Sequence, residues 1–271
     1  MMLQSDSCGG LDRIHPERSS GSECDGSIVR LPGHDEFSPA TRAFEITSIL
    51  VASALLAVLG FRTLPLIVGN PAWVFVGLLG VLLADFASGL IHWFADTWGH
   101  ETMPILGRRL LRPFRVHHLN PKDFLRRDFI DCNGDVAFLQ IPMLASTLFL
   151  MEHTSWGGAL GVFGLGLCGV GLFTNQFHLW AHRASPAPII RWLQDRGLIL
   201  GRAEHRRHHR QPHQTAYCIT TGWCNGPLDR IGFFPRLERF ITRCTGIPPR
   251  ADYHGFVSQH RGRAGNHPHH H

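Results

Sequence analysis

The sequence predicts an all-α polytopic membrane protein with four transmembrane helices and a His-rich helical cap on the cytosolic side. Three observations predict it: long apolar segments, basic residues confined to alternate connections, and histidine clusters at or just beyond the ends of apolar segments. The apolar segments cover residues 43–61, 72–94, 136–151 and 157–177. A bilayer core about 30 Å thick needs about 20 helical residues, so the second and fourth are long enough and the others slightly short.

The positions of Arg and Lys predict the orientation of the four helices. These residues are frequent before the first apolar segment, between the second and third, and after the fourth; only Arg62 separates the first two segments. Because basic residues concentrate on the cytosolic side of spanning helices, we expect both termini in the cytosol. The membrane would be the inner membrane of a bacterium or the endoplasmic reticulum of a eukaryote. Attraction to anionic headgroups explains the basic balance, so we expect no nucleic-acid partner.

Composition divides the chain into three parts. Residues 1–42 are rich in Ser, Gly, Asp and Arg without periodicity and predict a disordered cytosolic leader. Residues 43–245 form the membrane domain, in which amphipathic helices are expected over residues 189–200, lying on the membrane surface, and over residues 228–242. Residues 246–271 predict a disordered tail, whose His-rich end is compositional. Seven scattered cysteines without a C-x-x-C pair indicate reduced thiols.

Nine metal-capable side chains recur in four short clusters. Residues at positions i, i+3 and i+4 share one helix face, so each cluster can direct its ligands toward a common point. The nine exceed the four ligands of a structural zinc, whereas two iron ions with open positions for oxygen would use the whole set. A lone histidine is usually a surface or core residue, and we exclude His15, His34, His254, His260 and the tail. The clusters are His92-x-x-x-Asp96, His117-His118, His178-x-x-x-His182 and His205-x-x-His208-His209.

Asp85 is a carboxylate inside the second apolar segment, on one helical stripe with Gly89, His92 and Asp96. An intramembrane carboxylate costs on the order of 2.5–3.5 kcal/mol, so Asp85 should face the interior of the helix bundle. Two interpretations stay open at this point. Asp85 orients a ligand histidine, or it makes a hydrogen bond between helices.

A glycine motif in the fourth apolar segment, Gly164-x-Gly166-x-x-Gly169, matches the dinucleotide-binding fingerprint as a string. No strand precedes it, and the surrounding residues are apolar. We therefore predict that these glycines allow close helix packing in lipid and bind no nucleotide.

Several longer motifs occur in order over roughly residues 75–240. Together they resemble the plasmanylethanolamine desaturase family of lipid desaturases. The motifs are His92-Trp93-x-x-Asp96-Thr97-Trp98-Gly99, Arg112-Pro113-Phe114-Arg115-x-His117-His118-x-x-Pro121, Arg127-Asp128-Phe129-Ile130-x-x-Asn133-Gly134-Asp135, His178-x-Trp180-x-His182, His205-x-x-His208-His209 and Ile219-Thr220-Thr221-Gly222-Trp223-x-Asn225-x-Pro227-Leu228.

The resemblance implies a membrane desaturase domain over residues 43–245 that uses O₂ and two iron ions to convert the 1-O-alkyl chain of an ether phospholipid into the vinyl ether of a plasmalogen. The predicted topology brings all four clusters to the cytosolic headgroup boundary, beside the two carbons that such a reaction desaturates. We find no flavin, nicotinamide, haem or iron–sulfur pattern, so electrons must come from an external donor of the cytochrome b5 or ferredoxin type.

The sequence departs from the broader membrane desaturases at two positions. Asp96 stands where an HxxxH motif has its second histidine, and Phe114 stands where an HxxHH motif begins. Whether Asp96 binds iron directly or orients a ligand therefore stays open. The candidates for completing or orienting the ligand set are Asp85, Asp128, Asp135 and His213.

Two other functions remain compatible with the sequence. An acyl-lipid desaturase or hydroxylase acting on an ester-linked chain would use the same iron site. A metal-binding membrane protein with a signalling role would bind metal without turnover.

Overall fold

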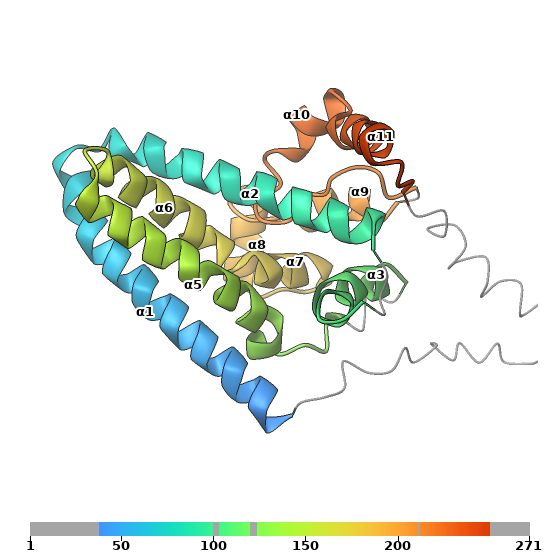
Figure 1. The fold of residues 1–271 in the computed structure, drawn as a ribbon, viewed down its shortest axis with the longest axis horizontal. Helices are drawn as coiled ribbons and strands as arrows, with labels where there is room; N and C mark the ends of the chain where they lie inside the picture. Colours follow the sequence, from blue (N-terminus) through green and yellow to red (C-terminus); the bar gives the residue numbers. More distant parts are fainter. Residues whose placement is uncertain (1–37, 100–102, 120–123, 211, 250–271) are drawn as a thin grey trace, which may run out of the picture. The chain divides into compact units, whose positions relative to one another are not determined.

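A computed structural model describes residues 38–99, 103–119, 124–210 and 212–249 of the chain (Figure 1). Within these ranges the protein consists of helices and connecting loops, without a β-strand, which confirms the predicted all-α class. Most of the predicted leader and tail, and the four excluded histidines, lie outside the described residues.

Four helical stretches are long and apolar enough to cross a membrane, which confirms the predicted number. Each extends beyond its predicted apolar segment at one end or both. α1 begins four residues before the expected Ala43, where the Ser38 hydroxyl caps it by accepting the Thr41 N–H at 3.0 Å. The stretches are α1 (Pro39–Gly69), α2 (Trp73–Thr97), α5 (Phe129–His153) and the consecutive helices α6 (Gly157–Gly171) and α7 (Thr174–His182).

Glycines let the spanning helices approach closely. A methyl group on Gly166 of α6 would overlap the backbone oxygen of Gly77 on α2, and one on Gly164 would overlap the Thr147 side chain of α5. Gly164 and Gly166 of the motif therefore allow close helix packing, as predicted, whereas a methyl group on Gly169 would meet no atom within 4 Å. Between α1, α5 and α6 lies the apolar core of Ala52, Leu59, Ala137, Leu144, Cys168 and Leu172.

Shorter helices follow α2 and α7. The two amphipathic helices predicted after the fourth span differ in extent from those observed. The first ends at Asp195, before Gly197 with φ 65°, and the second is broken at Gly232 with φ 59°, because left-handed glycines end helices. The short helices are η1 (Gly107–Leu111), α3 (Arg112–Leu119), α8 (Pro188–Asp195), α9 (Arg202–His208), α10 (Asn225–Arg230) and α11 (Phe233–Thr245).

The helices alternate in direction, so the carboxyl ends of α2 and α7 lie at the same end of the bundle as the amino ends of α1 and α5. At this end the Arg42 guanidinium of α1 pairs with Asp128 at the start of α5. Figure 1 shows α3 and α9 at the same end. Arg62 pairs with Glu152 toward the opposite end. All four histidine clusters therefore belong to one end of the bundle.

Candidate metal centre

The structure brings all nine predicted ligands together and divides them into two groups. Within each group the candidate ligand atoms lie within 4.8 Å of one another, and every side chain is buried or half-buried. The five-histidine group consists of His117, His178, His182, His205 and His209. The Asp96 group consists of His92, Asp96, His118 and His208.

Helix geometry explains much of this division, although His208 joins the Asp96 group while His205, three positions earlier, joins the other. Side chains four positions apart lie on one helix face, and His178 with His182, and His205 with His209, remain together. Side chains one position apart point in different directions. The adjacent histidines 117 and 118, like 208 and 209, are therefore split between the two groups.

His205 lies at the centre of the five-histidine group. Its Nε2 atom is 3.0 Å from Nε2 of His178, 2.8 Å from Nε2 of His182 and 2.9 Å from Nε2 of His209. In a neutral imidazole each ring nitrogen is either a hydrogen-bond donor or an acceptor. Nε2 of His205 therefore cannot form good hydrogen bonds with all three of the other Nε2 atoms. A cation that accepts their lone pairs resolves this conflict, and the donor set therefore fits a transition metal.

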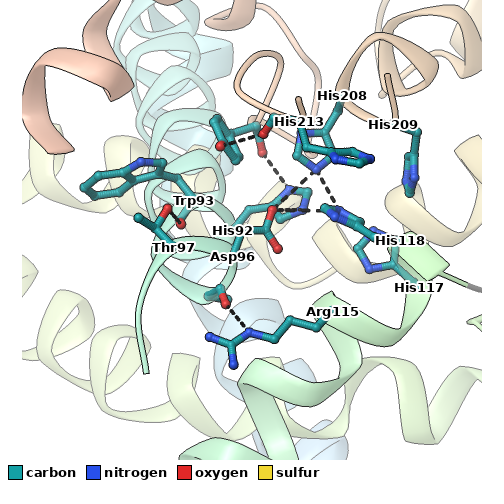
Figure 2. Close-up of polar contacts among 12 residues, drawn as sticks. His92, Trp93, Asp96, Thr97, Arg115, His117, His118, His208, His209 and His213 are labelled. Atoms are coloured by element: carbon teal, nitrogen blue, oxygen red, sulfur yellow. Dashed lines mark hydrogen bonds and ion pairs between the residues drawn. The ribbon is translucent and has the colours of Figure 1, made fainter. Parts of the chain in front are cut away.

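Asp96 provides the only carboxylate among the nine ligands. Its Oδ2 atom lies 3.4 Å from Nε2 of His92, 3.5 Å from that of His208 and 3.8 Å from that of His118 (Figure 2). The Nε2 atoms of His118 and His208 are 2.8 Å apart. Three imidazoles and one carboxylate at these separations also suit a transition-metal ion.

Burial keeps the ring nitrogens available to a metal. It lowers the pKa of His117, His118 and His205 well below the ordinary value of histidine, and neighbouring histidines lower these pKa values further. The pKa of His209 falls to about 2 for the same reasons. Because metal binds the neutral imidazole, these rings are ready to act as ligands across the physiological pH range.

Backbone carbonyls orient three of the candidate ligand rings. Nδ1 of His92 lies 3.0 Å from the Tyr217 oxygen, and Nδ1 of His208 lies 2.9 Å from the Thr215 oxygen. Nδ1 of His117 lies 3.3 Å from its own helix, at the Pro113 oxygen. A carbonyl only accepts, so each Nδ1 donates its proton and each Nε2 keeps its lone pair for a metal. Sequence reasoning missed these partners, because any residue type can offer a carbonyl.

Asp85 does not orient a histidine directly. Its described partners are four backbone N–H groups at 2.8–3.2 Å. The expected hydrogen bond between helices is therefore replaced by contacts between a helix and a loop, since Asp85 fastens a loop to α2. The loop begins near Tyr217, whose oxygen orients His92. The four N–H groups belong to Thr220, Thr221, Gly222 and Cys224.

The other three candidates also lie outside the two groups. Asp128 caps α5 by accepting the N–H groups of Ile130 and Asp131 at 2.9 Å, and Asp135 pairs with Arg109 at 2.8 Å. Both carboxylates are therefore paired with arginines, and Asp128 also caps a helix. The His213 ring stacks on His118 with ring centroids 5.0 Å apart.

Arg115 is a further residue that sequence reasoning did not assign to the site. Its guanidinium is buried and donates to the backbone oxygens of Ala95 at 3.0 Å, Trp98 at 2.5 Å and Gly99 at 3.1 Å. It thereby caps the carboxyl end of α2, where helix carbonyls lack intrahelical partners. Because Arg115 belongs to α3, this contact holds His118 against Asp96. The sequence signal that could have indicated this role is the position of Arg115, two residues before the His117-His118 pair.

Comparisons with known proteins agree with this geometry. Residues 81–252 match the lipid desaturase domain. The chain is 42% identical to a plasmanylethanolamine desaturase of Myxococcus xanthus, over 80% of this chain and 77% of that protein, and 40% identical to plasmanylethanolamine desaturase 1 of Mus musculus, over 80% and 83%. It is 32% identical to chloroplastic fatty acid desaturase 4 of Arabidopsis thaliana, over 65% and 53%. No solved structure matches. The chain therefore belongs to the lipid desaturase family, as its resemblance to the plasmanylethanolamine desaturases predicted, and is a desaturase-type oxidoreductase of the membrane.

Proposed function

We propose that the chain is a diiron desaturase that forms the vinyl-ether double bond in the 1-O-alkyl chain of an ether phospholipid. The observation that carries this proposal is the division of nine buried or half-buried ligands into two neighbouring groups. The ring centroids of His117 and His118, one from each group, lie 4.3 Å apart, so two metal ions held there would be close neighbours.

The balanced reaction removes two hydrogens from the chain. An –O–CH₂–CH₂– unit, O₂, two electrons and two protons become –O–CH=CH– and two waters. Bound iron would supply the reduction of O₂ and the oxidising power for breaking the two C–H bonds. Asp96 would contribute negative charge to one metal position, and the neutral histidines would contribute lone pairs without repelling a cation.

The protein's own contribution is orientation and exclusion of water. The carbonyls of Tyr217, Thr215 and Pro113 fix the ring tautomers, so the ligands need little rearrangement when metal binds. Burial of His92, His178 and His205 keeps bulk water from the ligand atoms. This environment protects a reactive oxidant from side reactions.

The names of the relatives support an ether lipid as substrate. Two of them are plasmanylethanolamine desaturases, and the desaturated carbons of such a lipid lie next to the ether oxygen, beside the headgroup. The ligand groups at one end of the bundle suit this depth. The Arabidopsis relative, a fatty acid desaturase, favours the second candidate, a desaturase of an ester-linked acyl chain.

We also propose that the metal end of the bundle faces the cytosol, because the basic connections belong to this end. An external cytochrome b5 or ferredoxin type donor would then supply electrons from the cytosolic side. Reporter tags at residue 20, near residue 120 and near residue 245 should report the cytosol, and a tag near Thr154 the opposite side. A cytosolic signal at Thr154 would contradict this topology.

Lipid analysis tests the proposed substrate. The chain should be expressed in a host that contains ether lipids but no plasmalogens, beside His205→Ala as the inactive control. We expect acid-labile vinyl ethers with the wild-type chain alone. New double bonds in ester-linked chains without vinyl ethers would identify the second candidate instead. Wild-type protein that binds iron but changes no lipid and consumes no O₂ would favour a signalling role.

A further inference from the structure

A non-helical segment lies beside the middle of α2. Asp85 is twelve residues from each end of this helix, Trp73 and Thr97, and it binds the loop described above. Ser88, three residues further along α2, accepts the N–H of Ile219 at 3.0 Å. The contact is close, because a methyl group on Gly89 would lie only 2.5 Å from the Cys218 sulfur.

The start of α11 also packs against α2, close to Asp85 and toward the metal end of that helix. The Phe233 ring packs edge-on against Phe86 with centroids 5.5 Å apart. The Phe234 ring lies 5.7 Å from that of Trp93. Residues 216–234, which we call the wedge, therefore follow the half of α2 between its middle and its metal end (Figure 1).

The length of α2 gives the depth of these contacts. Its 25 residues extend about 37 Å, whereas the hydrocarbon core of a bilayer is about 30 Å thick. The helix is therefore about 7 Å longer than the hydrocarbon core is thick, and Asp85 lies about 18 Å from the metal end of the helix. Even if all of the extra length projected beyond the metal end, Asp85 would lie about 10 Å inside the hydrocarbon. The loop bound to Asp85 shares this depth.

Polar backbone groups of the wedge form hydrogen bonds with protein side chains, as a position inside the hydrocarbon requires. Non-helical backbone is tolerated inside a membrane only where protein groups satisfy it. Asp85 accepts four N–H groups, and the buried Asn225 side chain accepts the Cys218 N–H at 2.8 Å and donates to its oxygen at 3.0 Å. Four hydrogen bonds to a carboxylate also offset the cost of placing Asp85 within the spanning helix.

The exposed side chains of the wedge are mostly apolar. Ile231 is 52% exposed and Trp223 is 38% exposed. On α2 itself, Leu79 is 57% exposed. Arg230 is an exposed neighbour with a side chain long enough to reach toward headgroups.

We propose that the wedge is immersed in the bilayer beside α2 and that Ile231 and Trp223 contact acyl chains of the surrounding lipid. The expected cap of this protein is then in part a membrane element. This inference does not depend on the identity of the metal or of the substrate.

Spin labels measure the depth directly. The full chain, with its exposed cysteines replaced by serine, should be placed in vesicles of phosphatidylethanolamine and phosphatidylglycerol and labelled at Ile231→Cys. Leu79→Cys serves as the control in lipid and Arg206→Cys as the control in water. O₂ concentrates in hydrocarbon and a nickel chelate stays in water, so the ratio of their collision rates with the label reports depth.

We expect the O₂-to-nickel ratio at residue 231 to resemble that at residue 79 and to exceed that at residue 206 several-fold. A ratio at residue 231 equal to that at residue 206 would overturn the inference and leave the wedge in water. Dipolar coupling between labels on separate chains would overturn it as well, because a second copy would then cover Ile231.

Discussion

The Nε2 atoms of His118 and His208 lie 2.8 Å apart although ninety positions separate these residues in the chain. His118 belongs to α3 and His208 to α9, and neither helix is long enough to be stable alone. The Asp96 group is therefore assembled only when both short helices dock on the carboxyl end of α2. The contacts that hold them there should control its metal affinity.

Arg115→Lys tests the docking of α3. Lysine keeps the charge but lacks the fork of donors that reaches the oxygens of Ala95, Trp98 and Gly99. We expect iron content to fall by about half, because the Asp96 group loses His118 whereas the five-histidine group retains four ligands without α3. Product formation should fall below detection, because the proposed reaction needs both iron ions.

Arg239→Lys is the matched control, since this arginine is exposed on α11, and iron content and activity should stay unchanged. Metal analysis and lipid analysis of both variants provide the measurement. Full iron content and turnover in Arg115→Lys would show that the contact with α2 does not position the Asp96 group.

Asp96→Asn separates a ligand from a residue that orients a ligand. Nδ1 of His92 is already held by the Tyr217 oxygen, and the Asp96 oxygen lies among three Nε2 atoms. We therefore expect loss of about half the iron and of all detectable product, because a neutral amide is a poor substitute for an anionic oxygen. Full iron content with turnover lowered 10- to 100-fold would instead indicate an orienting role.

Gly166→Ala tests helix packing remote from the metal centre. A methyl group at this position meets the backbone of α2 at Gly77, which cannot move aside. Overpacking of this kind typically costs about 1–3 kcal/mol, so the thermal midpoint should fall. Gly169→Ala is the control from the same helix, because its added methyl group meets no atom within 4 Å. Equal midpoints for the two variants would contradict the close crossing.

The sequence predicts the spanning helices and the ligands because both depend on local patterns. Apolar runs reveal the spans, and histidines at spacings of three and four residues reveal shared helix faces. The partition into two groups was also accessible in principle, since His117 and His118 cannot point the same way on one helix.

The surroundings of the ligands depend on contacts that sequence spacing does not show. Asp85 binds backbone groups more than 130 positions away, and Tyr217 orients His92 through its backbone oxygen. Asp128 and Asp135 belong to a motif between two histidine clusters, yet arginines of α1 and η1 engage them. The breaks at Gly197 and Gly232 reflect a backbone conformation that glycine permits but does not require.

The iron content of the purified full chain tests the central claim most directly. We predict about two iron ions per wild-type chain, and about one in His92→Ala, because that substitution removes a ligand from the Asp96 group and leaves all five histidines of the other group in place. One zinc ion and no iron in the wild-type protein, after expression with both metals supplied, would contradict the diiron account.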